Sequence, residues 1–179
     1  MLQEKTQILI ERSRSGDKKA FEQLVIEFQA VIFRLVFRLL CDEDEAKDIV
    51  QETFIKAWLN LDKYRVQYSF TTWIYRIACN LCYDSLRSTQ HRFERMPQDL
   101  HPVASENVEQ ALINKDLKAL IILFSQQLTA KQRLVFTLSE IEELSVKEIE
   151  AITRLSPAKI KSNLYLAKKR IKEKMNQIK

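Results

Sequence analysis

The sequence predicts an all-α protein of two small helical domains joined by a flexible linker, the second containing a helix-turn-helix. The 179 residues include one glycine and three prolines, fewer turn residues than a sheet protein needs. Apolar residues recur every three or four positions through most of the chain, as in amphipathic helices. This period stops from Gln90 to Asn107, where two of the prolines lie. We therefore expect domains at residues 1–89 and 108–179 and a linker at 90–107.

Three helices are expected in the first domain. The first carries apolar residues at helical spacing from Ala20 to Leu39. The second begins at Asp42, which has capping-box spacing with Glu45. The third ends near Ser88, and the domain ends with it.

Capping signals define the helices of the second domain. A first helix is expected to begin near Val108. Thr129 has capping-box spacing with Gln132, and Ser145 has the same spacing with Glu148, so each pair predicts the start of a helix.

The last predicted helix begins with Ser156 as N-cap and Pro157 at its first position. A short helix, a tight turn and a longer basic helix are typical of a helix-turn-helix. Thr153, Arg154 and Leu155 lie in this turn. The stripe expected to be buried comprises Ile160, Leu164, Ala167, Ile171 and Met175. A plain αα-hairpin with a basic surface is the alternative.

Charge is distributed unevenly along a chain of net charge +5. The segment from Ser156 to Lys179 holds eight basic residues and one acidic residue, whereas Asp42 to Glu52 holds six acidic residues and one lysine. This polarity indicates two partners of opposite charge, unless both segments are ordinary solvated helix faces.

Composition also indicates the compartment. No run approaches the roughly 20 apolar residues that cross a bilayer, and the first residues lack the apolar core of a signal peptide. Three cysteines argue against a disulfide framework. We expect a cytoplasmic protein with no direct membrane insertion.

No metal, cofactor or catalytic residue is expected. Cys79 and Cys82 form a C-x-x-C, but they lie within a continuous helical pattern without the turn of a zinc finger, so buried thiols are expected. His91 and His101 lie in the linker without the partners of a catalytic triad, and one glycine cannot form a phosphate-binding loop.

Three segments in a fixed order carry a resemblance to a known family. They are DEAKDIVQETFIKAW, FTTWIYRIACNLCYD and LTAKQRLVFTLSEIEELSVKEIEAITRLSPAKIKSNLYLAKKRI. In turn they resemble the polymerase-binding helix, the promoter-melting helix and the carboxy-terminal DNA-binding module of bacterial RNA polymerase sigma factors of the extracytoplasmic-function (ECF) group. The resemblance extends from about Asp17 to Met175. It implies promoter-specific transcription initiation, with core RNA polymerase (clamp coiled coil and flap) and promoter DNA as partners and an anti-sigma factor as inhibitor.

The acidic helix carries the polymerase-binding residues that the resemblance implies. They lie together on the side away from the apolar residues, and they are Asp48, Gln51, Glu52 and Ile55. An acidic ridge with one apolar residue suits docking on a basic partner helix, because charge governs encounter and orientation. Phe54 and Trp58 are expected to pack rather than to contact the partner.

The third helix and the loop before it carry the predicted contacts with the downstream promoter element. These are Tyr64, Phe70, Trp73, Arg76, Asn80, Tyr83 (or Asp84 in its place) and Arg87. Opening a duplex requires phosphate anchors, hydrogen-bonding groups and flat surfaces for unstacked bases, and this set has all three. The family's loop holds a flipped base and often contains glycine, whereas Tyr64 to Phe70 contains none.

The basic helix carries the predicted contacts with the upstream promoter element. They are Lys159, Lys161, Ser162, Tyr165 and Lys168. Lysines on such a helix meet phosphates, and polar groups near its start meet base edges in the major groove.

Two other functions are compatible with parts of this pattern. A stand-alone helix-turn-helix regulator predicts tight duplex binding by the isolated protein as a dimer, but leaves the acidic ridge unexplained. An all-helical nuclease predicts metal-dependent turnover of nucleic acid, for which the sequence offers only the scattered acids of Asp42 to Glu52.

Overall fold

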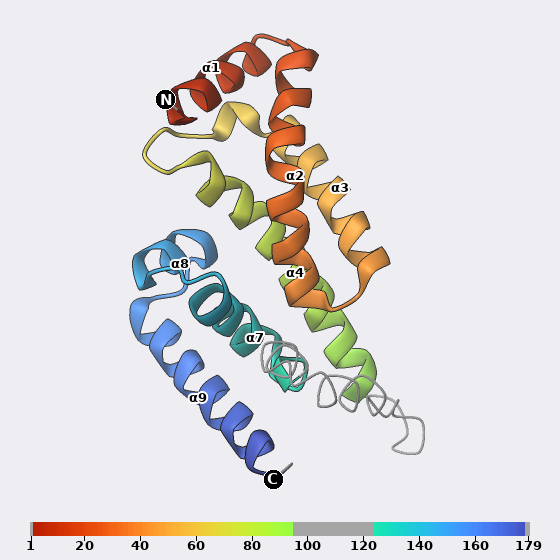
Figure 1. Cartoon of the computed structure of the whole chain (residues 1–179), viewed down its shortest axis with the longest axis vertical. Coiled ribbons are helices and arrows are strands. Elements are labelled where there is room, and N and C mark those ends of the chain that lie inside the picture. The colour runs from red at the N-terminus through yellow and green to blue at the C-terminus, as the bar shows by residue number, and fades with distance from the viewer. Residues whose placement is uncertain (1, 95–123, 178–179) are drawn as a thin grey trace.

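The computed structural model describes residues 2–94 and 124–177, and all regular structure in these ranges is helical, as predicted. The amino-terminal module contains α1 (Leu2–Arg14), α2 (Lys18–Leu40), α3 (Glu43–Leu59), the 3-10 helix η1 (Leu61–Lys63) and α4 (Phe70–Glu94). The carboxy-terminal module contains α7 (Ala130–Phe136), the π-helical turn η3 (Thr137–Ile141), α8 (Val146–Thr153) and α9 (Pro157–Asn176). Figure 1 shows the two modules side by side, with α9 on the side away from α3.

The corner between α2 and α3 combines a left-handed residue and a side-chain cap. Cys41 ends α2 with φ 57°, and its backbone N–H donates to the carbonyl of Phe37. Asp42 then accepts a 2.9 Å hydrogen bond from the backbone N–H of Glu45, as its spacing predicted. The Glu45 carboxylate does not complete the capping box; it accepts from the hydroxyl of Ser85 on α4 and so ties α3 to α4.

Two helices extend beyond the predicted pattern. The sequence analysis did not predict α1, which buries Leu9 and Ile10 against α2. Helix α4 continues to Glu94, past the residue where the linker was expected to begin. The rest of the predicted linker and the helix expected near Val108 lie outside the described residues.

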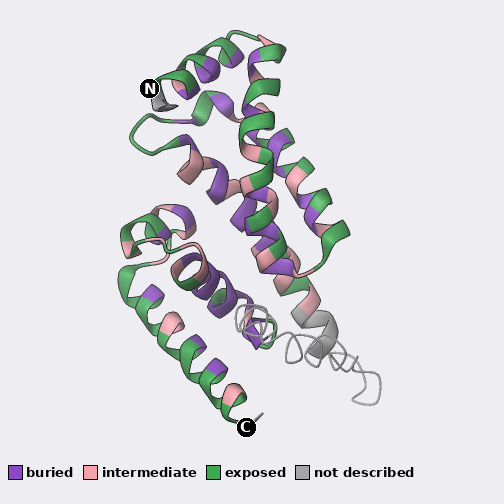
Figure 2. Ribbon diagram, in the orientation of Figure 1, coloured by how far each residue is buried: buried purple, intermediate pink, exposed green. Residues whose placement is uncertain are grey.

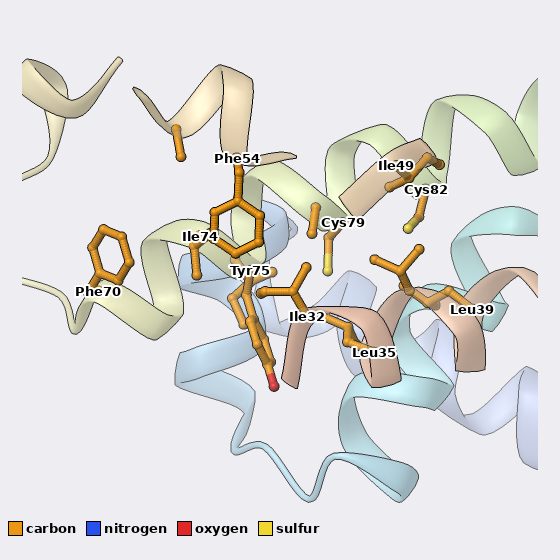
Figure 3. Packing of buried hydrophobic residues seen from close by; sticks show 14 of the residues in the cluster. Ile32, Leu35, Leu39, Ile49, Phe54, Phe70, Ile74, Tyr75, Cys79 and Cys82 are labelled. Carbon is orange, nitrogen blue, oxygen red and sulfur yellow. The ribbon is translucent and has the colours of Figure 1, made fainter. Parts of the chain in front are cut away.

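The amino-terminal core lies where α2, α3 and α4 meet. Figure 3 shows apolar side chains from these helices pointing toward one another. The labelled residues are Ile32, Leu35, Leu39, Ile49, Phe54, Phe70, Ile74, Tyr75, Cys79 and Cys82. Cys79 and Cys82 are 1% and 0% exposed, so the prediction of buried thiols is confirmed.

The carboxy-terminal module is the predicted helix-turn-helix. Both capping boxes form completely, Thr129 with Gln132 before α7 and Ser145 with Glu148 before α8. Arg154 lies in the predicted turn and ends α8 in the left-handed region with φ 59°, where the family of the resemblance usually has glycine. Ser156 caps α9, and Pro157 is its first residue.

The two modules share one hydrophobic core. Helices α7 and α8 pack against α4, and their buried residues belong to the same cluster as those of α2, α3 and α4. The carboxy-terminal members of this cluster are Leu134, Val135, Leu138, Ile149, Ile152 and Ile160. A smaller cluster holds α7 and α9 together, with Phe124, Leu128, Phe136, Ala167 and Ile171 as its buried members. The sequence predicted both modules but not the contact between them.

Candidate functional site

The acidic ridge lies on the exposed side of α3. All four of its predicted residues are exposed, Ile55 by 59%, while the opposite side buries Ile49 and Phe54 in the core. Figure 2 shows this alternation along α3. The ridge therefore presents carboxylates around one apolar side chain, as expected.

The sequence analysis missed one member of this surface. Leu59 is 69% exposed and lies four residues after Ile55, so it extends the apolar part of the ridge by one turn. The i, i+4 spacing was the available signal. Trp58 is half-buried and packs edge-on against Phe21, with ring centroids 4.9 Å apart, which confirms its expected packing role.

Two aromatic residues predicted to face bases lie instead in the core. Tyr64 and Phe70 are each 4% exposed, and their rings pack edge-on with centroids 5.7 Å apart. The Tyr64 hydroxyl donates to the carbonyl of Tyr68, and the Arg14 guanidinium lies 5.7 Å from the Tyr64 ring centroid. Neither ring can stack on a base in this arrangement, because both side chains are almost fully buried. They brace the loop that leads into α4.

Three of the remaining predicted contacts on α4 lie around a cavity of about 410 Å³. Trp73, Arg76 and Asn80 line it, together with Tyr68 of the preceding loop. Its basic lining residues are Lys56, Lys63, Arg65, Arg76 and Arg154, against the single carboxylate of Asp84. A hollow with aromatic walls and a positive rim suits an unstacked base and its phosphate.

The two other predicted positions on α4 are Tyr83, with Asp84 as its alternative, and Arg87. Tyr83 is partly buried against the core, whereas Asp84 is exposed and lines the cavity, so Asp84 is the member that faces the site. Arg87 is exposed one turn further along. The resemblance assigns the whole loop from Tyr64 to Phe70 to a flipped base, and within it Arg65, Val66 and Tyr68 are exposed.

Arg76 connects the cavity to the helix-turn-helix. Its Nε donates a 2.9 Å hydrogen bond to the carbonyl of Ala151 on α8, and its Nη2 donates to the same oxygen. Its guanidinium also lies 5.9 Å from the ring centroid of Tyr68. Burial, and then the positive charge of Arg154, hold the pKa of Arg76 below its usual range. Arginine remains protonated in proteins even when its pKa is lowered. In this arrangement the charged guanidinium of Arg76 is hydrogen-bonded to α8.

The predicted upstream-element contacts lie on the exposed side of α9. Lys159, Lys161, Ser162 and Lys168 are exposed, and Tyr165 is exposed by 68%. The opposite side buries three members of the predicted stripe, with Leu164 and Met175 partly buried. Lys168 is paired with Glu140 at 2.9 Å. Leu166, 42% exposed, is an apolar neighbour that the prediction did not include.

The residues that the structure describes include no candidate metal cluster and no candidate membrane span. No group of three His, Cys, Asp or Glu side chains there is arranged to hold a metal ion. None of the described helices combines the length and the apolar character of a membrane span. The side chains of His91 and His101 lie outside the described set.

Comparison with protein families gives two matches in the order of the modules. The family described as Sigma-70 region 2 matches residues 24–92, and that described as Sigma-70, region 4 matches residues 119–171. The RNA polymerase sigma-H factor of Pseudomonas aeruginosa is 32% identical over 185 residues, which cover 96% of this chain and 94% of the relative. The ECF RNA polymerase sigma-E factor of Escherichia coli (strain K12) is 31% identical over 184 residues, with coverage of 96% and 95%.

Solved structures share the fold. CnrH, solved in complex with the cytosolic domain of CnrY, gives a TM-score of 0.67 at 21% identity and covers 97% of this chain and 98% of its own. The sigma factor RpoE from Bartonella quintana, solved with the anti-sigma factor NepR, gives 0.64 at 23% identity, covering 88% and 98%.

Proposed function

Because the chain belongs to the ECF group of RNA polymerase sigma factors and directs transcription initiation, we propose that it divides this work among three surfaces. The acidic ridge of α3 binds the polymerase, the cavity beside α4 holds melted promoter DNA, and α9 reads duplex DNA upstream. The proposed modules are residues 1–89 and 108–179, with a linker at 90–107. The observation that carries the proposal is that the molecule has three separate accessible surfaces, of which the ridge on α3 is acidic and the cavity beside α4 and the exposed side of α9 are basic.

The ridge of α3 is proposed to dock on the clamp coiled coil of core RNA polymerase. Asp48 and Glu52 supply negative charge, which steers encounter with a basic helix, and Ile55 with Leu59 supplies apolar area for the contact. Glu52 is already paired with Lys56 at 2.9 Å, so Asp48 carries the less compensated charge. The carboxy-terminal module is proposed to contact the polymerase flap.

The cavity beside α4 is proposed to capture unpaired bases of the downstream element. Stacking one base on an aromatic ring contributes about 1 to 3 kcal/mol, which is comparable to the few kcal/mol needed to unpair it. Capture of the single strand can therefore drive opening without ATP. Trp73 and Tyr68 supply the rings, Asn80 supplies hydrogen bonds and Arg65 supplies phosphate contacts.

The exposed side of α9 is proposed to bind the upstream element in the major groove. Lys161, Ser162 and Tyr165 lie near the start of the helix, where side chains reach base edges. Lys159 and Lys168 are placed to meet phosphates. A stand-alone regulator is not favoured, because the amino-terminal module matches a sigma-factor family as well.

An anti-sigma factor is proposed as a further partner. Two proteins of the same fold were solved with protein partners, one of them named as an anti-sigma factor. Together with the match to the ECF relatives, this supports inhibition of the present chain by a protein of that kind.

Charge reversal on the ridge tests the assignment of surfaces. Asp48→Lys should weaken binding to core polymerase by about tenfold or more, because it places a cation against a basic partner. Glu22→Lys, an exposed reversal on α2, is the matched control and should bind normally. Pull-down with core polymerase followed by run-off transcription measures both. Equal binding by the two variants would remove α3 as the docking surface.

A further inference from the structure

The two modules pack together through α4, α7 and α8, and this is the closed arrangement of the chain. Three arginines each donate to the other module: Arg76 to the carbonyl of Ala151, Arg38 to the carboxylate of Glu142 and Arg133 to the sulfur of Cys41. The cavity beside α4 lies at this junction, because Arg154 of the helix-turn-helix is one of its lining residues. Its other lining residues belong to the amino-terminal module, so both modules build it.

Arg154 is an unusual residue for the turn between α8 and α9. Its φ of 59° lies in the left-handed region, which glycine adopts without strain and arginine does not. Its side chain is exposed, and among the described residues it has no hydrogen bond or ion pair. Packing therefore gives no reason for an arginine here, and backbone strain of this kind is frequent where a side chain binds a ligand.

Arg154 and Arg76 bring positive charge to the cavity from opposite modules. Burial, and then the nearby charge of Arg154, lowers the pKa of Arg76. The Arg76 guanidinium donates to a neutral carbonyl and not to an anion. Of the five basic lining residues, only Lys56 has a carboxylate partner among the described residues, Glu52 at 2.9 Å. The closed cavity thus gathers positive charge that an anionic ligand would neutralise.

The same cavity offers aromatic surface beside these cations. Tyr68 is 45% exposed and Trp73 is half-buried, and both line the cavity. Asn80 adds an exposed amide that can donate and accept hydrogen bonds. The volume of about 410 Å³ lies within the range of roughly 300 to 1,000 Å³ that is usual for small-ligand pockets. Rings, an amide and cations together match a ligand with a flat base and several phosphates.

We propose that the closed protein binds a free nucleotide with two or more phosphates in this cavity, and that the nucleotide holds the modules together. The base stacks on Tyr68 and Trp73, and the phosphates bridge Arg76 of α4 and Arg154 of the helix-turn-helix. Arg76 uses its Nε and Nη2 for Ala151, which leaves Nη1 for a phosphate oxygen. A ligand bound by the closed arrangement alone shifts the equilibrium toward it. The ligand also occupies the place of the melted strand, a consequence that rests on the proposed role of the cavity.

The position of Arg154 distinguishes a free nucleotide from a DNA strand as the source of the base and phosphates. The proposed function assigns the helix-turn-helix to the upstream duplex, so Arg154 completes the cavity only while the modules are together. A promoter strand held during initiation would therefore not need Arg154, whereas a ligand of the closed protein would. A single substitution can thus separate the two sources.

The first test is nucleotide binding by the full-length protein without polymerase. Trp58→Phe keeps a ring against Phe21 and leaves Trp73 as the only tryptophan, so fluorescence reports stacking in the cavity. ATP should quench this fluorescence to saturation. Arg154→Gly in the same background should raise the dissociation constant by about tenfold, the effect of losing one charge-assisted contact.

The variant and its control are matched in charge. Glycine adopts φ 59° without strain, so Arg154→Gly keeps the turn while it removes the cation. Lys147→Gln removes an exposed charge from α8 outside the cavity and should bind ATP as the wild type does. Equal ATP binding by the two variants, or no binding by the wild type at millimolar ATP, would overturn the proposal.

Two further probes identify the class of ligand. Tripolyphosphate, which has no base, should bind more weakly than ATP and leave the fluorescence unchanged; equal affinity for the two would show a site for anions in general and refute the nucleotide. A short single-stranded oligonucleotide should displace ATP and should bind wild type and Arg154→Gly equally. Oligonucleotide binding without ATP binding would also refute the proposal. ATP binding without oligonucleotide binding would support it while counting against the proposed melting surface, so the two failures are distinguishable.

The second test is whether the ligand holds the modules together. ATP should slow hydrogen exchange in both α4 and α8 of the wild type, because opening of the junction then also requires release of the ligand. Arg154→Gly should lose the added protection in α8, and Lys147→Gln should retain it. Protection confined to α4 would show a ligand held by one module and would refute the bridging role.

Discussion

At the scale of single residues, Asn80 is the sharpest test of the melting surface. It is exposed and lines the cavity beside α4, outside the packed side of the helix. Asn80→Ala should leave polymerase binding intact and reduce promoter opening by about tenfold, the effect of losing one good hydrogen bond. Permanganate footprinting of the melted region measures opening. A normal footprint would contradict the role, and Asp48→Lys should show the opposite pattern, with binding lost first.

Lys161 tests the surface of α9 in the same way. Lys161→Ala should weaken binding to the upstream element by about 1 to 3 kcal/mol if it reads a base, or lower the salt slope by about one if it meets phosphate. Titration of holoenzyme on promoter DNA over a range of salt separates the two cases. Lys174→Ala, near the end of α9, serves as the matched control. If both the affinity and the slope are unchanged, the contact lies elsewhere.

Residue-level prediction from sequence succeeded where the helical period decides the outcome. The period separates the exposed side of α9 from its buried stripe, so that Ile160 is buried and Lys161 is exposed, as expected. It says little about the loop before α4. Tyr64 and Phe70 are buried because they pack on each other and on neighbouring rings, a contact that no spacing rule for loops describes.

At the scale of elements, the capping box of α8 stabilises the first helix of the helix-turn-helix. Ser145→Ala should lower the free energy of unfolding by about 1 kcal/mol, because the backbone N–H of Glu148 loses its acceptor. Urea denaturation followed by circular dichroism measures the loss. Ser88→Ala, exposed on α4, is the control and should have little effect.

The same cap predicts a pH dependence. Hydrogen bonds from the Ser145 hydroxyl and backbone N–H hold the pKa of Glu148 below its ordinary value. A carboxyl with a lowered folded-state pKa stabilises the protein at neutral pH, and this contribution is lost as the pH falls through that pKa. The stability difference between wild type and Ser145→Ala should therefore narrow in acid. The unperturbed pKa of glutamate is about 4.3, so the narrowing should be visible below pH 4. A stability difference between the two proteins that stays constant in that range would contradict the prediction.

Element boundaries were predictable where a local signal marks them. Ser156 with Pro157 marked the start of α9, because a capping side chain and a proline act on their own backbone. The end of α4 carries no such signal, and the helix runs on to Glu94. Helix α1 buries the polar Thr6 and Ser13 beside Leu9 and Ile10, so its inner side shows too little apolar periodicity to predict the helix.

At the scale of the whole molecule, the shared core predicts one cooperative unit. Ile152 of α8 is 2% exposed in the cluster that also contains the α4 residues. Ile152→Ala should lower the free energy of unfolding by about 2 to 5 kcal/mol and quicken hydrogen exchange in α4 as well as α8. Ile171→Ala, in the smaller cluster, should leave α4 unchanged. Exchange confined to α8 in the first variant would argue for independent modules.

The contact between modules could not be predicted from the sequence. A helical period shows that one face of α4 or α8 is buried, but it does not show which partner buries it. Between the modules, three arginines contact a main-chain carbonyl, a carboxylate and a thiol. Such pairs produce no recognisable pattern along the sequence. Knowledge of the tertiary arrangement was needed to connect them.

The bond from Arg76 to Ala151 constrains how this protein can change over evolutionary time. Its acceptor is a peptide oxygen, which every residue type possesses, so no side-chain replacement at position 151 can delete it. A substitution that removes this hydrogen bond must therefore change Arg76 itself, which is also a cation of the proposed DNA cavity. Selection on the contact between the modules and selection on strand opening would then act on the same codon.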